Sequence, residues 1–307
     1  MKTKIDSVLI PTDFSDLSQS ALKVGIAIAK RQNAGITLLH VVDIFTYVEP
    51  SEVFLPEFKV MPDWVSSIEE NLDKLAKKIT QETGVKITAK VLEGQPADRI
   101  CRYAFENKTN LIVMGTHGTS GLREFFIGSE AFQVVKNAVC PVLTIPSHWE
   151  KTDFEKVLFP IRLKPGALDK YFYSRPIIEK NNSELFLLSL SEKKKTEDLK
   201  ELTYITDKLK VQLHNDNVNF QTVLSSCDDF PVKVIETANN VKADLIILTA
   251  NLDYDFKAYF VGPFAQQVIN HARLPVLSVK PANEPKDKDE QQKMAGEWGK
   301  TIDFSGL

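Results

Sequence analysis

The chain has 307 residues, of which 43% are hydrophobic and 26% are charged, and its formal net charge is −3. These proportions are ordinary for a globular protein, and the length favours two domains of roughly 150 residues each. The small negative charge gives no electrostatic basis for binding nucleic acid or an anionic membrane surface, and no apolar run approaches the ~20 residues that span a bilayer.

The cysteines and the N-terminus predict a cytoplasmic location. Cys101, Cys140 and Cys227 are an odd number of cysteines and form no C-x-x-C pair. This pattern is typical of a reducing compartment, without a disulfide framework or a cysteine metal site. The N-terminus lacks the apolar core of a signal peptide and leads directly into a strand.

Short apolar strands alternate with helices along the first half of the chain. Apolar runs and alternation predict strands at 7–11, 36–42, 85–92, 111–114 and 142–145. Helical spacing predicts helices after residue 15, at 64–83, at 96–106 and from 127 onward. Ser15 or Ser18 suits the cap of the first helix. Residues 43–63 carry three prolines and form an irregular stretch.

The second half repeats the first. The sequence VLIP at 8–11 returns as VLFP at 157–160, and NLIVM at 110–114 returns as DLIIL at 244–248. The first pair of segments is 149 residues apart and the second pair is 134 residues apart, so the second copy is 15 residues shorter. The difference falls after the second strand, and it marks 43–63 as an insertion in the first copy.

A glycine-rich segment, NLIVMGTHGTSGLREFFIGS at 110–129, follows the fourth strand. Glycines at 115, 118, 121 and 128 allow backbone N–H groups to approach an anion closely. The helix expected from 127 onward adds unpaired N–H groups and a partial positive charge at its start. The segment therefore predicts a phosphate cradle, although it matches neither the P-loop nor G-x-G-x-x-G.

The spacing G-x2-G-x9-G-S, from Gly115, Gly118, Gly128 and Ser129, resembles the nucleotide-binding motif of the universal stress protein family. The opening VLIPTDFS at 8–15 resembles the start of that family. The resemblance covers about 4–146 strongly and about 155–281 more weakly.

The resemblance implies an α/β fold of two tandem flavodoxin-like (adenine nucleotide alpha hydrolase-like) domains, 1–147 and 155–281, followed by a tail at 282–307. Each domain would be a five-stranded parallel sheet with helices on both faces. Strand one would lie beside strand four, so Asp13 and Gly115 would face each other across a crevice at the strand ends. The two copies would pack as an intramolecular pseudo-dimer through their fifth strands.

The family motif also implies a set of ligand-contacting residues. They are Pro11, Thr12, Asp13, Val41, Met114, Gly115, Gly118, Gly128, Ser129 and Glu130. Asp13 would bind the base and ribose, or alternatively cap the helix after Ser15. Val41 would offer backbone bonds to adenine, or alternatively be an ordinary core valine. The glycines would admit the triphosphate, with Ser129 donating to a phosphate oxygen.

The second copy departs from this motif. The residues at the positions of Asp13, Gly115, Gly118 and Ser129 are Arg162, Thr249, Leu252 and Pro263, and Gly262 alone is kept. Side chains would stand where backbone should meet phosphate, and proline removes an N–H from the helix start. We expect this copy not to bind ATP in the family manner, and to act as a structural partner or to hold a different ligand.

The sequence thus predicts an ATP-binding universal stress protein that acts as a nucleotide-responsive stress or signalling protein. His40, His148, His214 and His271 are scattered without ligand spacing, so we expect no metal site built from protein side chains. The cation that the sequence still allows is Mg²⁺ held mainly by the phosphates. Without a P-loop lysine or an arginine finger, we expect no catalytic residues and at most slow hydrolysis. The alternatives are a nucleotide-free interaction protein and an ATPase or adenylyl-transfer enzyme.

Several properties stay open from the sequence. It does not name the protein partner or the stress, and it does not decide between ATP, ADP, AMP and a cyclic nucleotide. It also leaves open whether the chain forms a homodimer, and whether the insertion at 43–63 closes over the nucleotide as a lid.

Overall fold

The structure is a computed structural model that describes residues 4–43, 62–116, 127–147, 149–163, 167–193, 198–250 and 263–280. Four sequence predictions concern residues outside these ranges: Gly118, Leu252 with Gly262, nearly all of the insertion at 43–63, and the tail at 282–307.

The first half contains five strands and four helices within the described residues. The strands are β1 (Ser7–Pro11), β2 (Gly35–Val42), β3 (Ile87–Glu93), β4 (Leu111–Gly115) and β5 (Val142–Ile145). The helices are α1 (Asp16–Gln32), α2 (Pro62–Thr83), α3 (Pro96–Glu106) and α4 (Ser129–Asn137).

The second half repeats the same order of elements. Its strands are β6 (Lys156–Ile161), β7 (Glu184–Ser191), β8 (Phe220–Ser226), β9 (Leu245–Thr249) and β10 (Val276–Val279). Its helices are α5 (Asp169–Asn181), α6 (Asp198–Asn215), α7 (Phe230–Val241) and α8 (Pro263–His271). The interval between β7 and α6 is shorter than that between β2 and α2, which agrees with an insertion in the first copy.

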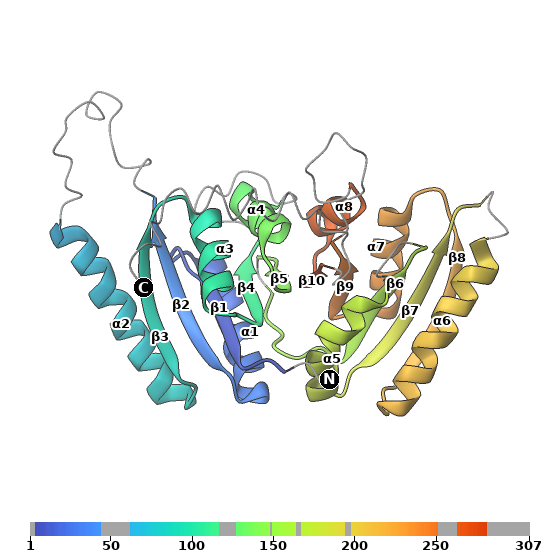
Figure 1. Ribbon diagram of the computed structural model, residues 1–307, viewed down its shortest axis with the longest axis horizontal. Helices are drawn as coiled ribbons and strands as arrows, with labels where there is room; N and C mark the ends of the chain where they lie inside the picture. Colours follow the sequence, from blue (N-terminus) through green and yellow to red (C-terminus); the bar gives the residue numbers. More distant parts are fainter. Residues whose placement is uncertain are drawn as a thin grey trace, which may run out of the picture.

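All ten strands belong to one sheet, in the order β3-β2-β1-β4-β5-β10-β9-β6-β7-β8 (Figure 1). Strands within each half pair in parallel, and the halves join through β5 and β10, which pair antiparallel. The Thr144 hydroxyl crosses this joint to the Val276 carbonyl over 3.2 Å. The α/β prediction of two five-stranded parallel halves is confirmed, and the fifth strands meet as expected.

Helices cover both faces of the sheet because the strands are apolar on both faces. Val8 and Ile10 of β1 face one buried cluster, to which α1, α2, α5 and α6 contribute. Leu9, between them, faces the other cluster, to which α3, α4, α7 and α8 contribute. This alternation is the period-two geometry of a strand. Because helices cover both faces, the carboxyl ends of the strands, where the loops emerge, remain accessible for a site.

The residue before the fourth strand of each half holds the start of the first strand. In the first half, Asn110 Oδ1 accepts from the N–H groups of Asp6 and Ser7, at 2.9 and 3.0 Å. In the second half, Asp244 Oδ2 accepts from the Lys156 N–H at 3.0 Å, while Oδ1 contacts Lys151 Nζ at 2.6 Å. The Asp244 side chain is 6% exposed.

Replacing Asp244 by alanine should lower the free energy of unfolding by about 1–2 kcal/mol, because a part-buried amide loses its acceptor. Asp244→Asn should change it by less than about 0.5 kcal/mol, since the amide oxygen can take over the bond, as Asn110 does in the first half. Urea unfolding of both variants checks this. Equal losses in both variants would mean that the ion pair with Lys151 is the important contact.

Candidate functional site

The strand order reverses direction between β1 and β4, where parallel α/β sheets hold their ligands. Val8 pairs with Leu111 and Leu9 with Ile112, so β1 and β4 are direct neighbours. The chain leaves these strands at the same edge of the sheet. The segment containing Asp13 and the segment after Gly115 therefore emerge side by side, as predicted from the sequence.

The turn after β1 is built around Thr12, which is 9% exposed. Its N–H donates to the Leu39 carbonyl at 2.8 Å, and its Oγ1 accepts from the Phe14 N–H at 3.1 Å. Phe14 adopts a positive φ of 62°, and its ring lies 4.9 Å from that of His40. His40 Nδ1 in turn contacts the Thr12 carbonyl at 2.8 Å. Phe14 lies in the family-like opening VLIPTDFS, but neither Phe14 nor His40 was given a role from the sequence.

Asp13 is half-buried and organises the start of α1. Its Oδ1 accepts from Ser15 N–H at 3.0 Å and from Ser15 Oγ at 2.6 Å. Ser15 is the N-cap, and its hydroxyl accepts from the Ser18 N–H at 3.2 Å. Of the two caps that the sequence offered, the structure uses Ser15, and Asp13 orients that cap. Its contact with ribose stays a prediction.

Val41 lies near the end of β2, beyond Pro11 and Leu39, which form the last residue pair between β1 and β2. The Leu39 carbonyl faces β1, where it accepts from Thr12. Because backbone groups two residues apart along a strand point the same way, the Val41 backbone also faces that side, past the end of β1. Its side chain packs against the second buried cluster. The structure thus places the partly buried Val41 side chain against the core and its backbone at an edge position, and its contact with adenine stays a prediction.

Backbone hydrogen bonds hold the residue after β4 and the residue before α4 together. The Thr116 N–H donates to the Ile145 carbonyl at 3.0 Å, and the Gly128 N–H donates to the Thr116 carbonyl at 2.6 Å. Gly128 is the N-cap of α4 and brings no side-chain oxygen to the first turn. Ser129 follows as the first helical residue and is exposed. The amides of Ser129 and Glu130 therefore begin an α4 terminus that opens toward solvent.

Two predicted site residues have their side chains in structural contacts. Glu130 Oε2 accepts from the Ala97 N–H at 2.7 Å, at the first turn of α3, where a negative charge is favourable. Met114 is 7% exposed and packs in the second buried cluster. Their place in a ligand site stays a prediction.

Two basic side chains, Arg162 and Lys170, lie near the carboxyl end of β6 in the second half. The guanidinium of Arg162 lies 3.7 Å from the centroid of the Phe264 ring at the start of α8. Lys170 is 3% exposed, its Nζ donates to the Pro160 carbonyl, and burial together with Arg162 lowers its pKa to about 7. The buried hydroxyl of Thr249 has no hydrogen-bond partner within the described ranges. At the positions of Asp13 and Gly115, the second half thus carries the larger residues Arg162 and Thr249.

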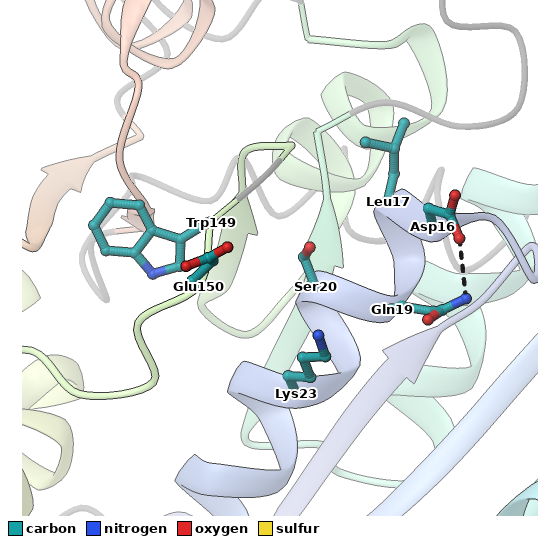
Figure 2. Close-up of a pocket in the computed structure, with 7 residues that line it drawn as sticks. All are labelled: Asp16, Leu17, Gln19, Ser20, Lys23, Trp149 and Glu150. Atoms are coloured by element: carbon teal, nitrogen blue, oxygen red, sulfur yellow. Dashed lines mark hydrogen bonds between the residues drawn. The ribbon is translucent and has the colours of Figure 1, made fainter.

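A separate open pocket of about 290 Å³ lies between α1 and the segment that joins the halves. Figure 2 shows Asp16 and Gln19, joined by a 3.2 Å hydrogen bond, on α1, and Trp149 with Glu150 across from Ser20. The lining residues are Asp16, Leu17, Gln19, Ser20, Lys23, Trp149 and Glu150. This pocket contains none of the predicted nucleotide-contacting residues.

Within the described ranges, no three or more His, Cys, Asp or Glu side chains group as metal ligands. Burial raises the pKa of the Cys101 and Cys140 thiols to about 12, so both stay protonated. None of the helices in these ranges combines the length and hydrophobicity of a membrane span.

Comparison with known proteins follows the same division into halves. The model of the universal stress protein family matches residues 4–146 and 178–280, which is most of the chain. The chain belongs to the universal stress protein family. The two matched segments show a tandem member, with one family unit on each side of the β5–β10 joint.

Individual relatives in the family cover one half or both. Universal stress protein MJ0531 of Methanocaldococcus jannaschii is 40% identical over 139 residues, which are 45% of this chain and 80% of that protein. Universal stress protein YxiE of Bacillus subtilis is 33% identical over 145 residues, 46% of this chain and 98% of its own. A universal stress protein of Archaeoglobus fulgidus matches both halves, with a TM-score of 0.70, 19% identity, and coverage of 91% of this chain and 98% of its own. At that identity the match shows the fold alone.

Proposed function

We propose that this universal stress protein binds ATP in the crevice of its N-terminal half and acts as a nucleotide-responsive stress or signalling protein. The observation that carries the proposal is the start of α4. Its N-cap is Gly128, its first residue Ser129 is exposed, and the Gly128 N–H is bound to the carbonyl of Thr116, which follows β4 at the switch point of the sheet. A helix start of this kind offers backbone donors and a partial positive charge to a phosphate.

The other parts of the nucleotide fit the remaining residues. The phosphates would meet the amides of Ser129 and Glu130 and the Ser129 hydroxyl. The ribose would meet Asp13, and the adenine would meet the backbone of Val41 beyond the end of β1. Mg²⁺ would be held mainly by the phosphates, since they supply the hard oxygen ligands that it prefers. Binding would change the state that a protein partner recognises.

The second half supports a stoichiometry of one nucleotide per chain. Pro263 opens α8 without an N–H, and the Arg162 guanidinium covers the ring of Phe264 next to it. Thr249 places a side chain at the position of Gly115. The proline removes a backbone donor that the first half offers, and Arg162 and Thr249 are larger than the Asp13 and Gly115 of the first half.

Mass spectrometry of the nucleotide released from purified protein, with calorimetric titration of ATP, ADP, AMP and cyclic AMP, tests the proposal. We expect ATP to bind with one site per chain. Two equivalent sites would contradict the assignment of the second half. Absence of any bound or titratable nucleotide would favour the nucleotide-free interaction protein.

Asp13→Ala should weaken ATP binding about tenfold, the equivalent of one lost charged hydrogen bond. Asp13→Asn is the matched control for the fold, because its oxygen can still accept from Ser15 as the Asp13 Oδ1 does. Titration of both variants with ATP and with AMP checks this. Unchanged affinity in Asp13→Ala would remove Asp13 from the site.

A further inference from the structure

The amide of Ile127, directly before the α4 N-cap, is held by the other half of the chain. Its N–H donates to Oδ1 of Asn270, on α8, at 3.1 Å. The next amide, that of Gly128, donates to Thr116 of its own half. Helices α4 and α8 stand at the same edge of the sheet, on either side of the β5–β10 joint (Figure 1). Two successive amides thus tie the entrance of α4 to both halves at once.

The acceptor is held in place by the packing of its own helix. On α8, the neighbours Val268 and Ile269 are 0% and 3% exposed in the second buried cluster. The strand that follows α8, β10, is paired with β5 of the first half, which in turn pairs with β4. The position of Asn270 relative to β5 and β4 is therefore fixed by the sheet.

The corresponding position of the first half cannot accept a hydrogen bond in the same way. The residue of the first half that corresponds to Asn270 is Lys136, in the last turn of α4. A lysine ammonium carries donors and no acceptor, so it cannot accept the bond from an amide in the reverse direction. The residue that corresponds to Ile127 is Val261, which lies outside the described residues. The half with the degenerate motif therefore supplies the acceptor, and the half with the intact motif uses it.

We propose that Asn270 is a positioning residue for the phosphate-binding end of the N-terminal site. By holding the Ile127 amide, it fixes the direction in which the chain enters α4, and with it the orientation of the Ser129 and Glu130 amides. The inference rests on the proposed function and gives the second half a defined part in it. Since coupling between two events is reciprocal, nucleotide bound at α4 strengthens the contact with α8.

The test combines amide hydrogen exchange at Ile127 with calorimetric titration of ATP, on Asn270→Ala and Asn270→Asp. In Asn270→Ala, we expect exchange at Ile127 to be at least about tenfold faster and ATP affinity to fall about tenfold, which is 1.4 kcal/mol. Asn270→Asp keeps an acceptor oxygen and should retain the protection of the Ile127 amide from exchange. Added ATP should slow exchange at Ile127 in the wild type. Lys136→Ala, at the corresponding position, should leave exchange at Ile127 unchanged.

Exchange at the core amide of Val268 reports whether α8 itself stays folded in each variant. If Asn270→Ala binds ATP as the wild type does, the positioning role is wrong while the proposed function stands. A wild type that binds no nucleotide would overturn the proposed function and the positioning role together. Loss of protection at Ile127 in Asn270→Asp as well as in Asn270→Ala, with Val268 still protected, would also contradict the role of the acceptor oxygen.

Discussion

Replacing Lys170 by methionine should stabilise the protein at pH 7 by about 2–3 kcal/mol, whereas most core substitutions destabilise. The amine is buried, donates to the Pro160 carbonyl and lies 4.5 Å from the centroid of the Phe159 ring. Burial and the nearby Arg162 lower its pKa from 10.5 to about 7. At about 1.4 kcal/mol per pKa unit, this shift opposes folding by about 5 kcal/mol at low pH. Methionine removes that penalty and loses one hydrogen bond, worth about 1–2 kcal/mol.

The same shift gives the wild type a pH-dependent stability. Between pH 7 and 10.5 the unfolded chain holds a proton on Lys170 that the folded chain has released, so stability rises with pH across this window. The penalty is complete below about pH 7 and absent above 10.5. The charge that acts on Lys170 besides burial is that of Arg162, which disfavours the ammonium form.

Urea unfolding at several pH values between 6.5 and 9.5 checks both expectations, with Lys200→Met on the exposed surface of α6 as the control. The difference between Lys170→Met and the wild type should shrink as the pH rises, and the control should change stability by less than about 0.5 kcal/mol. If Lys170→Met is less stable than the wild type at pH 7, the amine is charged in the folded protein and has a partner that stabilises the charge.

Local patterns predicted the fold well, because the apolar spacing in each segment matches the strand or helix that the segment forms. The strand at 7–11, the helix at 96–106 and the strand at 142–145 have the predicted bounds. The third strand begins two residues later than expected, at Ile87, because Val85 is buried just after Gly84, which turns the chain with a φ of 74°. An apolar residue next to a turn extends the alternating pattern without extending the strand.

The site was less predictable, because its contacts join residues far apart in the sequence. Glu130 meets α3 at Ala97, and Asn270 meets Ile127, 143 residues away. Neither contact has a local signature, since both acceptors lie on helices that have ordinary amphipathic patterns. Lys170 was also missed, because a lysine at the start of a helix is normally exposed. The family motif predicted which two segments meet at the crevice between β1 and β4, while the side-chain contacts around it required the three-dimensional structure.

Replacing Ser129 by aspartate should weaken ATP binding about 30- to 100-fold without lowering the stability of the protein. Ser129 is the first residue of α4 and is exposed. A carboxylate there interacts favourably with the helix N-terminus, by about 0.3–1 kcal/mol, so the empty protein should melt no lower than the wild type. The same charge competes with the phosphates for the same amides and repels them. If Ser129→Asp keeps its stability but loses ATP affinity, Ser129 has a ligand-binding role and not a structural one.

Gln133→Glu is the matched control, because it adds the same charge one turn further along α4 at another exposed position. Its effect on ATP affinity should stay within about threefold, since charge effects at a helix terminus fall off within the first turn. Titration in 0.05 M and 0.5 M salt should show a smaller difference between Ser129→Asp and the wild type at high salt, because screening weakens the repulsion. If Ser129→Asp binds ATP as tightly as the wild type, the phosphates do not lie at the start of α4. The nucleotide would then have to be placed elsewhere in the crevice.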